Sequence, residues 1–134
     1  MRCLTLTASL ALAALCLGCA ESSAGNNSDN EGTFSLTWSI VVNGGAGTCA
    51  EVGAKTVEVI STRAGSGSGI SDTFSCSSLA GTTAPLPAGD YTVVVKLLSA
   101  TDVQLNSADI VLTEHLLSGD LLDLGTFDFA FTLP

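Results

Sequence analysis

Five cysteines carry most of the reactive chemistry that this 134-residue chain could offer. A thiol can take a lipid, join a disulfide or bind a metal ion. Cys19 follows Gly18 at the end of an apolar run over residues 4–17, and Arg2 supplies a positive charge before that run. The run would make a helix of roughly 21 Å, which is short of the roughly 30 Å hydrocarbon core of a bilayer. The pattern therefore predicts a secretory signal peptide over residues 1–18, cut just before Cys19.

The segment Leu17-Gly18-Cys19 resembles the lipobox of bacterial lipoproteins, although Cys16 stands where that family usually has leucine. The resemblance implies that Cys19 carries fatty acids, as a diacylated and often N-acylated cysteine. It also implies a lipid-anchored protein of the outer membrane, facing the periplasm or the cell surface, since Ala20 replaces the aspartate that retains many such lipoproteins in the inner membrane. Two or three acyl chains anchor a protein stably, because each buried methylene contributes about 0.8 kcal/mol. The alternative is an ordinary signal peptide cut nearby, for example after Ala20.

The other cysteines follow from this assignment. Cys3 and Cys16 leave with the signal peptide and Cys19 takes lipid, so that Cys49 and Cys76 remain as an even pair in an oxidising compartment. A bond between them would close a loop of about 28 residues, worth roughly 3–4 kcal/mol in the chain-entropy model. A zinc site is the alternative, but the pair lacks the CxxC spacing typical of zinc ligands and the chain has one histidine. We therefore predict a Cys49–Cys76 disulfide.

The charge of the mature chain limits its partners. From Cys19 onward there are thirteen acidic residues and three basic ones, Lys55, Arg63 and Lys96, so the net charge is about −10. Binding to nucleic acid is excluded as a natural function, because phosphate binding needs clustered lysine and arginine. The acidity also disfavours direct docking on an anionic lipid surface, and it favours solubility of a strand-rich domain.

Several motifs could indicate catalysis or cofactor binding, and each fails in its context. Residues 45–50 match the G-x-G-x-x-A dinucleotide fingerprint, but a further strand pattern follows where the fingerprint needs a helix. Residues 65–69 miss the G-x-S-x-G nucleophile motif by one position. His115, the single histidine, would need a serine and an acid converging on it, and a lone histidine near a turn is usually solvated. We therefore expect no catalytic residue, no cofactor and a protein that is not an enzyme.

Three aspartates near the C-terminal end are weak candidates for a metal site. Asp120, Asp123 and Asp128 flank a turn and the strand after it, and with backbone carbonyls they could bind Ca²⁺, which takes six to eight oxygen ligands. Their spacing does not match an EF-hand loop. The alternative is that Asp120 closes its turn while the other two face water, and we expect no metal.

Alternation of apolar and small polar residues predicts that residues 33–134 form one all-β domain. Strand patterns with intervening Gly-rich or Pro-containing turns recur along the chain, near residues 33–42, 55–60, 70–76, 91–97, 103–112 and 127–133. No window keeps a helical period. Short strands and frequent turns are typical of an antiparallel β-sandwich, here of about seven strands. Residues 19–32, rich in Ser, Gly and Asn, are predicted to be a flexible linker.

The aromatic residues bear on carbohydrate binding, which would need exposed rings. Trp38 shares the strand parity of Phe34 and Ile40, so we expect it in the core rather than on a binding platform. The same parity argument applies to Phe127, Phe129 and Phe131. Tyr91 is expected to expose its hydroxyl group.

The segment from Leu86 to Val93, Leu-Pro-Ala-Gly-Asp-Tyr-Thr-Val, resembles the L-x-x-G-x-Y-x-V strand entry of immunoglobulin-like and transthyretin-like (prealbumin-like) domains. This resemblance implies that the glycine turns the chain into a central strand and that the tyrosine packs near the start of the strand. Trp38, the Cys49/Cys76 pair and this segment are together similar to a group of small bacterial lipoproteins. Trp38 precedes both cysteines, so true immunoglobulin packing is not implied.

The sequence thus leads to one functional expectation and one alternative. We expect a non-enzymatic, lipid-anchored envelope protein that serves as a binding or structural module, attached to the membrane through its N-terminal lipid, with an envelope protein as a partner. The alternative is a β-sandwich module that binds Ca²⁺ or carbohydrate.

Overall fold

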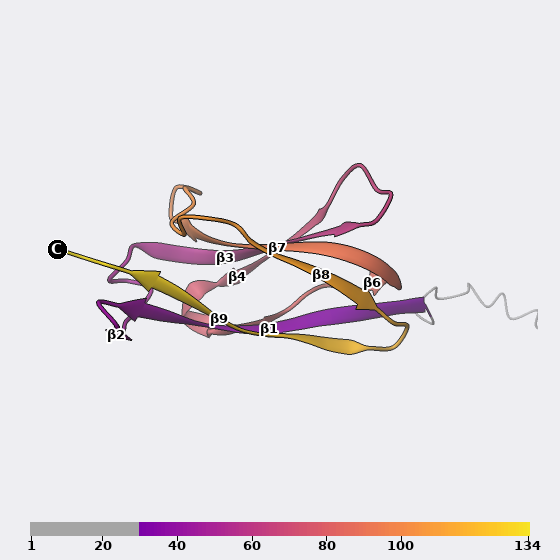
Figure 1. Ribbon diagram of the computed structural model, residues 1–134, viewed down its shortest axis with the longest axis horizontal. Coiled ribbons are helices and arrows are strands. Elements are labelled where there is room, and N and C mark those ends of the chain that lie inside the picture. Colours follow the sequence, from indigo (N-terminus) through magenta and orange to yellow (C-terminus); the bar gives the residue numbers. More distant parts are fainter. Residues whose placement is uncertain (1–29) are drawn as a thin grey trace, which may run out of the picture.

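The computed structural model describes residues 30–134, which form two β-sheets packed face to face (Figure 1). The predicted all-β sandwich is therefore confirmed. The predicted signal peptide, the lipid on Cys19 and most of the linker lie outside the described residues. Glu31 and Gly32, which the sequence assigned to the predicted linker, belong to the first strand. No helix within residues 30–134 is long and apolar enough to cross a membrane.

The first sheet is built around one long strand, β1, Glu31–Val42. On one side β1 pairs in parallel with β9, Leu121–Phe131. On its other side lie three short antiparallel segments, one after another, which are β2 (Gly45–Ala46), β5 (Ala80–Thr82) and β6 (Leu86–Pro87). The edge of β1 that faces away from β9 is thus covered piece by piece rather than by one strand.

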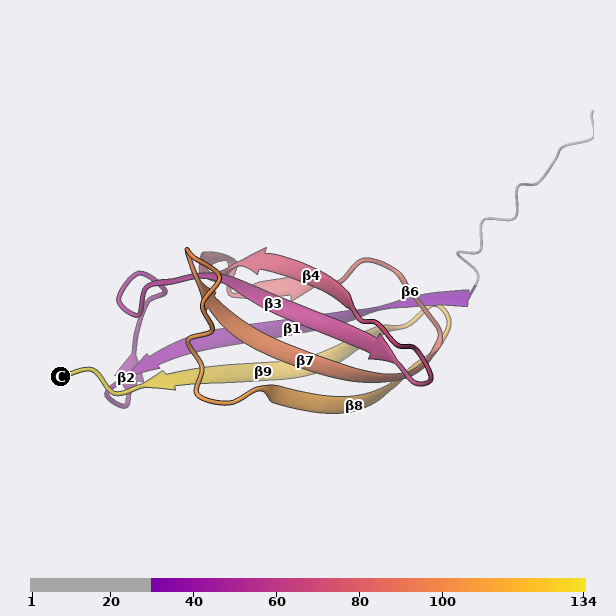
Figure 2. The same ribbon diagram turned by 90° about the horizontal axis from the view of Figure 1, so that it is seen from above.

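The second sheet is a regular antiparallel arrangement in the order β4-β3-β7-β8 (Figure 2). Its strands are β3 (Ala54–Arg63), β4 (Ile70–Ser75), β7 (Gly89–Ser99) and β8 (Ile110–Leu116). One turn of 3-10 helix, η2 (Cys76–Ser78), leads from β4 of this sheet to β5 of the other. A short turn at residues 117–120 likewise joins β8 to β9, so these two strands form the margins of the two sheets on the same side of the sandwich (Figures 1 and 2).

Alternation along the strands builds the core. Phe34, Leu36, Trp38 and Ile40 of β1 are each at most 3% exposed, which confirms that Trp38 is a core residue. Valines and leucines of β3 and β7 face them from the second sheet, namely Val57, Val59, Val93, Val95 and Leu97. Burial of one such side chain stabilises the fold by about 1.5–3 kcal/mol. Phe129 is buried in the same core, whereas Phe127 and Phe131 are partly buried against it.

Three details differ from the expectations drawn from the sequence. The described part of the chain contains nine strands rather than about seven, because three of them have only two or three residues. The β1–β9 pair is parallel, while every other strand pair is antiparallel. The strand predicted over residues 103–112 begins only at Ile110, because the Asn106 side chain accepts a hydrogen bond from the Leu97 amide and donates one to the Ala108 carbonyl. These bonds hold the preceding residues in a loop.

Candidate functional site: the side between strands β8 and β9

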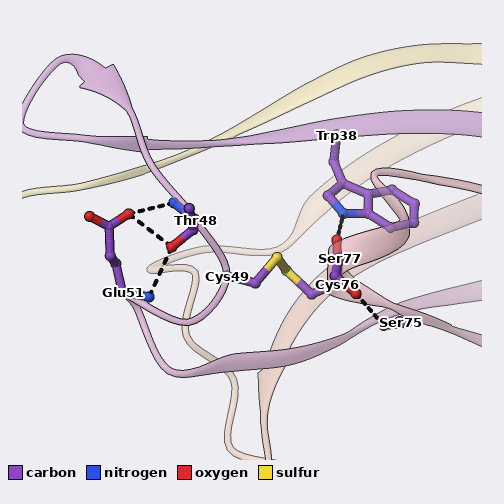
Figure 3. Close-up of a disulfide and its surroundings, with 7 residues drawn as sticks. All are labelled: Trp38, Thr48, Cys49, Glu51, Ser75, Cys76 and Ser77. Carbon is purple, nitrogen blue, oxygen red and sulfur yellow. Dashed lines mark hydrogen bonds between the residues drawn. A yellow bond between two sulfur atoms is a disulfide. The ribbon is translucent and has the colours of Figure 1, made fainter.

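The predicted disulfide between Cys49 and Cys76 is present, with 6.0 Å between the Cα atoms (Figure 3). It joins the loop before β3 to the start of η2. Next to it, the Trp38 indole N–H donates a hydrogen bond of 2.8 Å to the Cys76 carbonyl. Thr48 donates to the Glu51 carboxylate from both its amide and its hydroxyl group, which fixes the loop that carries Cys49. This end of the sandwich is therefore held firmly in one arrangement.

Tyr91 lies in the core, contrary to the expectation of an exposed hydroxyl group. It is 2% exposed, and its hydroxyl donates a 2.6 Å hydrogen bond to the Pro87 carbonyl. Its ring meets the Phe34 ring edge-on, with 5.7 Å between the centroids. Burial raises the pKa of the Tyr91 phenol above 10.0, and the positive charge of Arg63 offsets part of that rise. Tyr91 is therefore a structural residue that ties the β6 segment to the entry of β7.

His115 is paired rather than free. Its Nδ1 atom lies 2.6 Å from Oδ1 of Asp90, its cross-strand neighbour on β7. The two side chains are 61% and 68% exposed, so the pair contributes little to stability even when the imidazole is protonated. The geometry shows a surface contact between two neighbouring strands.

The three candidate aspartates each serve a local contact. The Asp120 carbonyl accepts a hydrogen bond from the Thr33 amide, Asp123 accepts one from the Gly125 amide, and Asp128 accepts one from the Ser39 hydroxyl. Within residues 30–134, no three His, Cys, Asp or Glu side chains are close enough together to hold a metal ion. The structure thus spreads these aspartates along β9 and its turn.

β8 and β9 lie at the margins of their sheets, on one side of the sandwich. Each strand is hydrogen-bonded on one edge only, and the outer edge of each has no partner strand within residues 30–134. Apolar side chains of both strands pack against the core but stay partly exposed on this side, namely Ile110, Leu112, Leu122, Leu124 and Phe127. A hollow of about 240 Å³ lies between residues 106–110 and the β9 residues 128–131. We call this region the β8–β9 side.

The β8–β9 side belongs to a strongly acidic part of the chain. No lysine or arginine follows Lys96, and six acidic residues do, namely Asp102, Asp109, Glu114, Asp120, Asp123 and Asp128. Glu114 lies on the same face of β8 as Ile110 and Leu112, so a carboxylate stands on the apolar face near its edge. Asp102 lines a separate hollow with Glu58 and Lys96, whereas the other five lie in β8, in β9 or next to them, so the charge on this side is negative.

Comparisons with known proteins add little to this site. No known protein family matches the chain, and no curated protein sequence matches it. Among solved structures it is similar to a leucine-rich repeat protein from Bacteroides thetaiotaomicron, with 16% sequence identity and a TM-score of 0.37. The match covers 78% of this chain and 12% of that protein, so this chain spans a small part of its length. A likeness this distant carries no argument about function.

No local sequence pattern predicts the β8–β9 side. The only signal for it was the absence of basic residues after Lys96, which is visible in the chain. Which strands end up at the margins depends on pairing between distant segments, and no local pattern reports that pairing. Two features that the sequence singled out, Tyr91 and the Cys49–Cys76 disulfide, have structural roles instead.

Proposed function

We propose that this protein is a non-enzymatic, lipid-anchored module of the bacterial envelope, most fittingly of the outer membrane, that binds a partner protein. The observation that carries the proposal is the position of the chain entry. β1 starts at one end of the sandwich, beside the β8–β9 turn, while the loop over residues 100–109 and the C-terminal residues lie at the other end (Figure 1). An anchor on Cys19 would leave that far end and the β8–β9 side free for a partner.

Tethering also supports a binding role on physical grounds. A linker of about a dozen polar residues has an r.m.s. span of roughly 20 Å, which keeps the domain near the membrane without fixing it there. Confinement near a surface raises the local concentration of the domain, so that a weak contact with a partner in the same membrane can suffice.

The anchor is tested by mass spectrometry of the protein purified from its native envelope. We expect an N-terminal fragment that starts at Cys19 and carries acyl chains, and we expect Cys19→Ser to move the protein from the membrane fraction to the soluble fraction. Cys3→Ser is the matched control, because that residue leaves with the predicted signal peptide, and it should change neither property. An unacylated start, for example at Glu21, would contradict the anchor.

A partner is sought by a pull-down from native envelope with Cys19 intact.

Binding of calcium or carbohydrate is the second candidate function. The described contacts do not favour it over binding of a partner protein. A rise in melting temperature with Ca²⁺ or with a glycan, and no enriched protein in the pull-down, would reverse that order.

A further inference from the structure

We infer that the free edge of β9 binds an extended, cationic segment of a partner protein, which adds to the first sheet as a strand beyond β9. This inference rests on the proposed function, and it specifies the conformation and the charge of the partner segment. Three independent features of the β8–β9 side support it, which are the orientation of the β9 backbone, the half-covered apolar side chains and the charge.

The backbone of β9 offers hydrogen-bonding groups on its outer edge. The Phe131 carbonyl accepts a hydrogen bond from the Asn43 amide at 2.9 Å, so the backbone groups of Phe131 point toward β1. Both polar groups of one strand residue point to the same edge, and successive residues alternate. The backbone groups of Asp128 and Ala130 therefore point away from β1, and both residues line the hollow beside residues 106–110. An added strand would find its hydrogen-bond partners there.

Apolar side chains of the two margins specify one face of the added strand. Phe127 and Leu124 of β9 and Leu112 of β8 are inward-facing but only partly buried. A strand added beyond β9 would place every second side chain over them and remove that apolar surface from water, at about 25 cal/mol per Å². The segment should therefore have an apolar residue at alternate positions.

Charge specifies the other face and argues against other occupants. Asp128 is exposed on β9, where its carboxylate accepts a hydrogen bond from Ser39, and Asp109 lies in the chain between Ala108 and Ile110, which line the hollow. Lysine or arginine side chains at the remaining positions of the segment would meet these carboxylates. A second copy of β9 would instead bring its own aspartates next to them, and residues 19–32 contain no lysine or arginine. A cationic segment from another protein is the occupant that fits.

The test uses the full chain, purified with its anchor in detergent, and an octapeptide of alternating valine and lysine as the probe. We expect binding that weakens as salt is raised, with changes in amide NMR signals concentrated in residues 106–116 and 121–131. The peptide with glutamate in place of lysine should not bind. Binding of both peptides alike, or signal changes centred on β3 and β4, would overturn the inference.

A variant of the β9 edge separates strand addition from simple charge attraction. Ala130→Pro removes an outward backbone N–H and keeps the pairing of its neighbours with β1, so we expect the peptide affinity to fall by about tenfold or more. Ala130→Ser is the matched control, because it keeps the N–H and should bind as the unaltered protein does. In case Ala130→Pro does not fold, the unaltered protein is tested with a peptide N-methylated at alternate residues, which should bind about tenfold more weakly on the same grounds. Equal affinity of the N-methylated and plain peptides would rule out strand addition.

The contribution of charge is tested separately. Asp128→Asn keeps an acceptor for Ser39 and should weaken binding by about threefold, whereas Glu58→Gln in the other sheet should not change it. An equal loss in both variants would contradict a site on β9. These outcomes do not depend on the lipid, because peptide binding can fail while Cys19 is acylated and can succeed when it is not. The inference and the proposed anchor therefore fail by different measurements.

Discussion

At the scale of single residues, Tyr91 shows how a polar group is accommodated in an apolar core. Its hydroxyl has a backbone acceptor in Pro87, and the ring packs against Phe34, so burial costs little as long as the phenol stays protonated. Burial raises the pKa of the folded phenol above the ordinary 10.0. Below about pH 10 the phenol is protonated in both states and its contribution to stability is complete. As the pH rises further, the unfolded chain ionises first and that contribution is lost.

We predict that Tyr91→Phe lowers the free energy of unfolding by about 1 kcal/mol near neutral pH, and that this difference shrinks above about pH 10. Urea unfolding of both proteins, near pH 7 and above pH 10, measures the difference in free energy. Tyr91 is the one tyrosine in the chain, so tyrosinate absorbance of the folded protein reports this pKa directly. Phenylalanine does not titrate, so any change in the stability of the variant above pH 10 comes from groups other than Tyr91. A folded protein whose tyrosinate forms at or below pH 10 would contradict the account.

At the scale of elements, the sequence predicted the strands better than their pairing. The alternation of Phe34, Trp38 and Ile40 is a local property, and it placed β1 and its buried face correctly. The parallel pairing of β1 with β9 and the short segments β2, β5 and β6 arise from contacts between distant residues, which no local pattern encodes. The loop before β8 was misassigned because one side chain, Asn106, supplies hydrogen bonds that would otherwise come from a strand. The position of β9 at the margin of its sheet follows from this pairing and not from its own sequence.

The irregularity in β9 gives a prediction at this scale. Between the pairs Ser35–Asp123 and Thr37–Thr126, β9 contains one more residue than β1, and Gly125 in this bulge has a φ of 90°. Its amide is bonded to the Asp123 side chain at 2.8 Å. A Cβ atom at Gly125 would meet no neighbour, so the cost of a side chain there is one of backbone conformation.

We expect Gly125→Ala to lower the free energy of unfolding by about 1–2 kcal/mol, as measured by urea denaturation. Gly67→Ala is the matched control, because Gly67 also has open space around its Cβ position but no positive φ. Its effect should be within about 0.5 kcal/mol of zero. Equal effects at the two glycines would show that the bulge does not require a glycine.

At the scale of the whole molecule, the two ends of the sandwich differ in their relation to the proposed anchor. Leu117 and Leu121, which flank the β8–β9 turn, are 54% and 64% exposed. Hydrogen bonds from Gly119 to Glu31 and from Thr33 to Asp120 fasten this turn to the start of β1. Two exposed leucines therefore lie where the chain enters the domain. Val103, which is also exposed, belongs to the loop over residues 100–109, and Figure 1 shows this loop at the opposite end.

We predict that the lipidated protein in nanodiscs of zwitterionic lipid approaches the bilayer with its β8–β9 turn. Spin labels on the lipid headgroups should broaden the amide signals of residues 117–121 more than those of residues 100–105. Replacing both leucines with serine should reduce this difference, whereas Val103→Ser should leave it unchanged. Uniform broadening along the chain would show that the tether does not orient the domain.

The parallel pairing of β1 with β9 also has a consequence for folding during synthesis. Their contacts span as many as 89 positions, as between the Thr37 and Thr126 hydroxyl groups. A polypeptide is synthesised from its N-terminus. Almost the entire domain must therefore be synthesised before β9 can pair with β1 and help to cover its apolar face. Closing so distant a pairing is slow. During that delay β1 is the stretch that a chaperone would have to shield from aggregation.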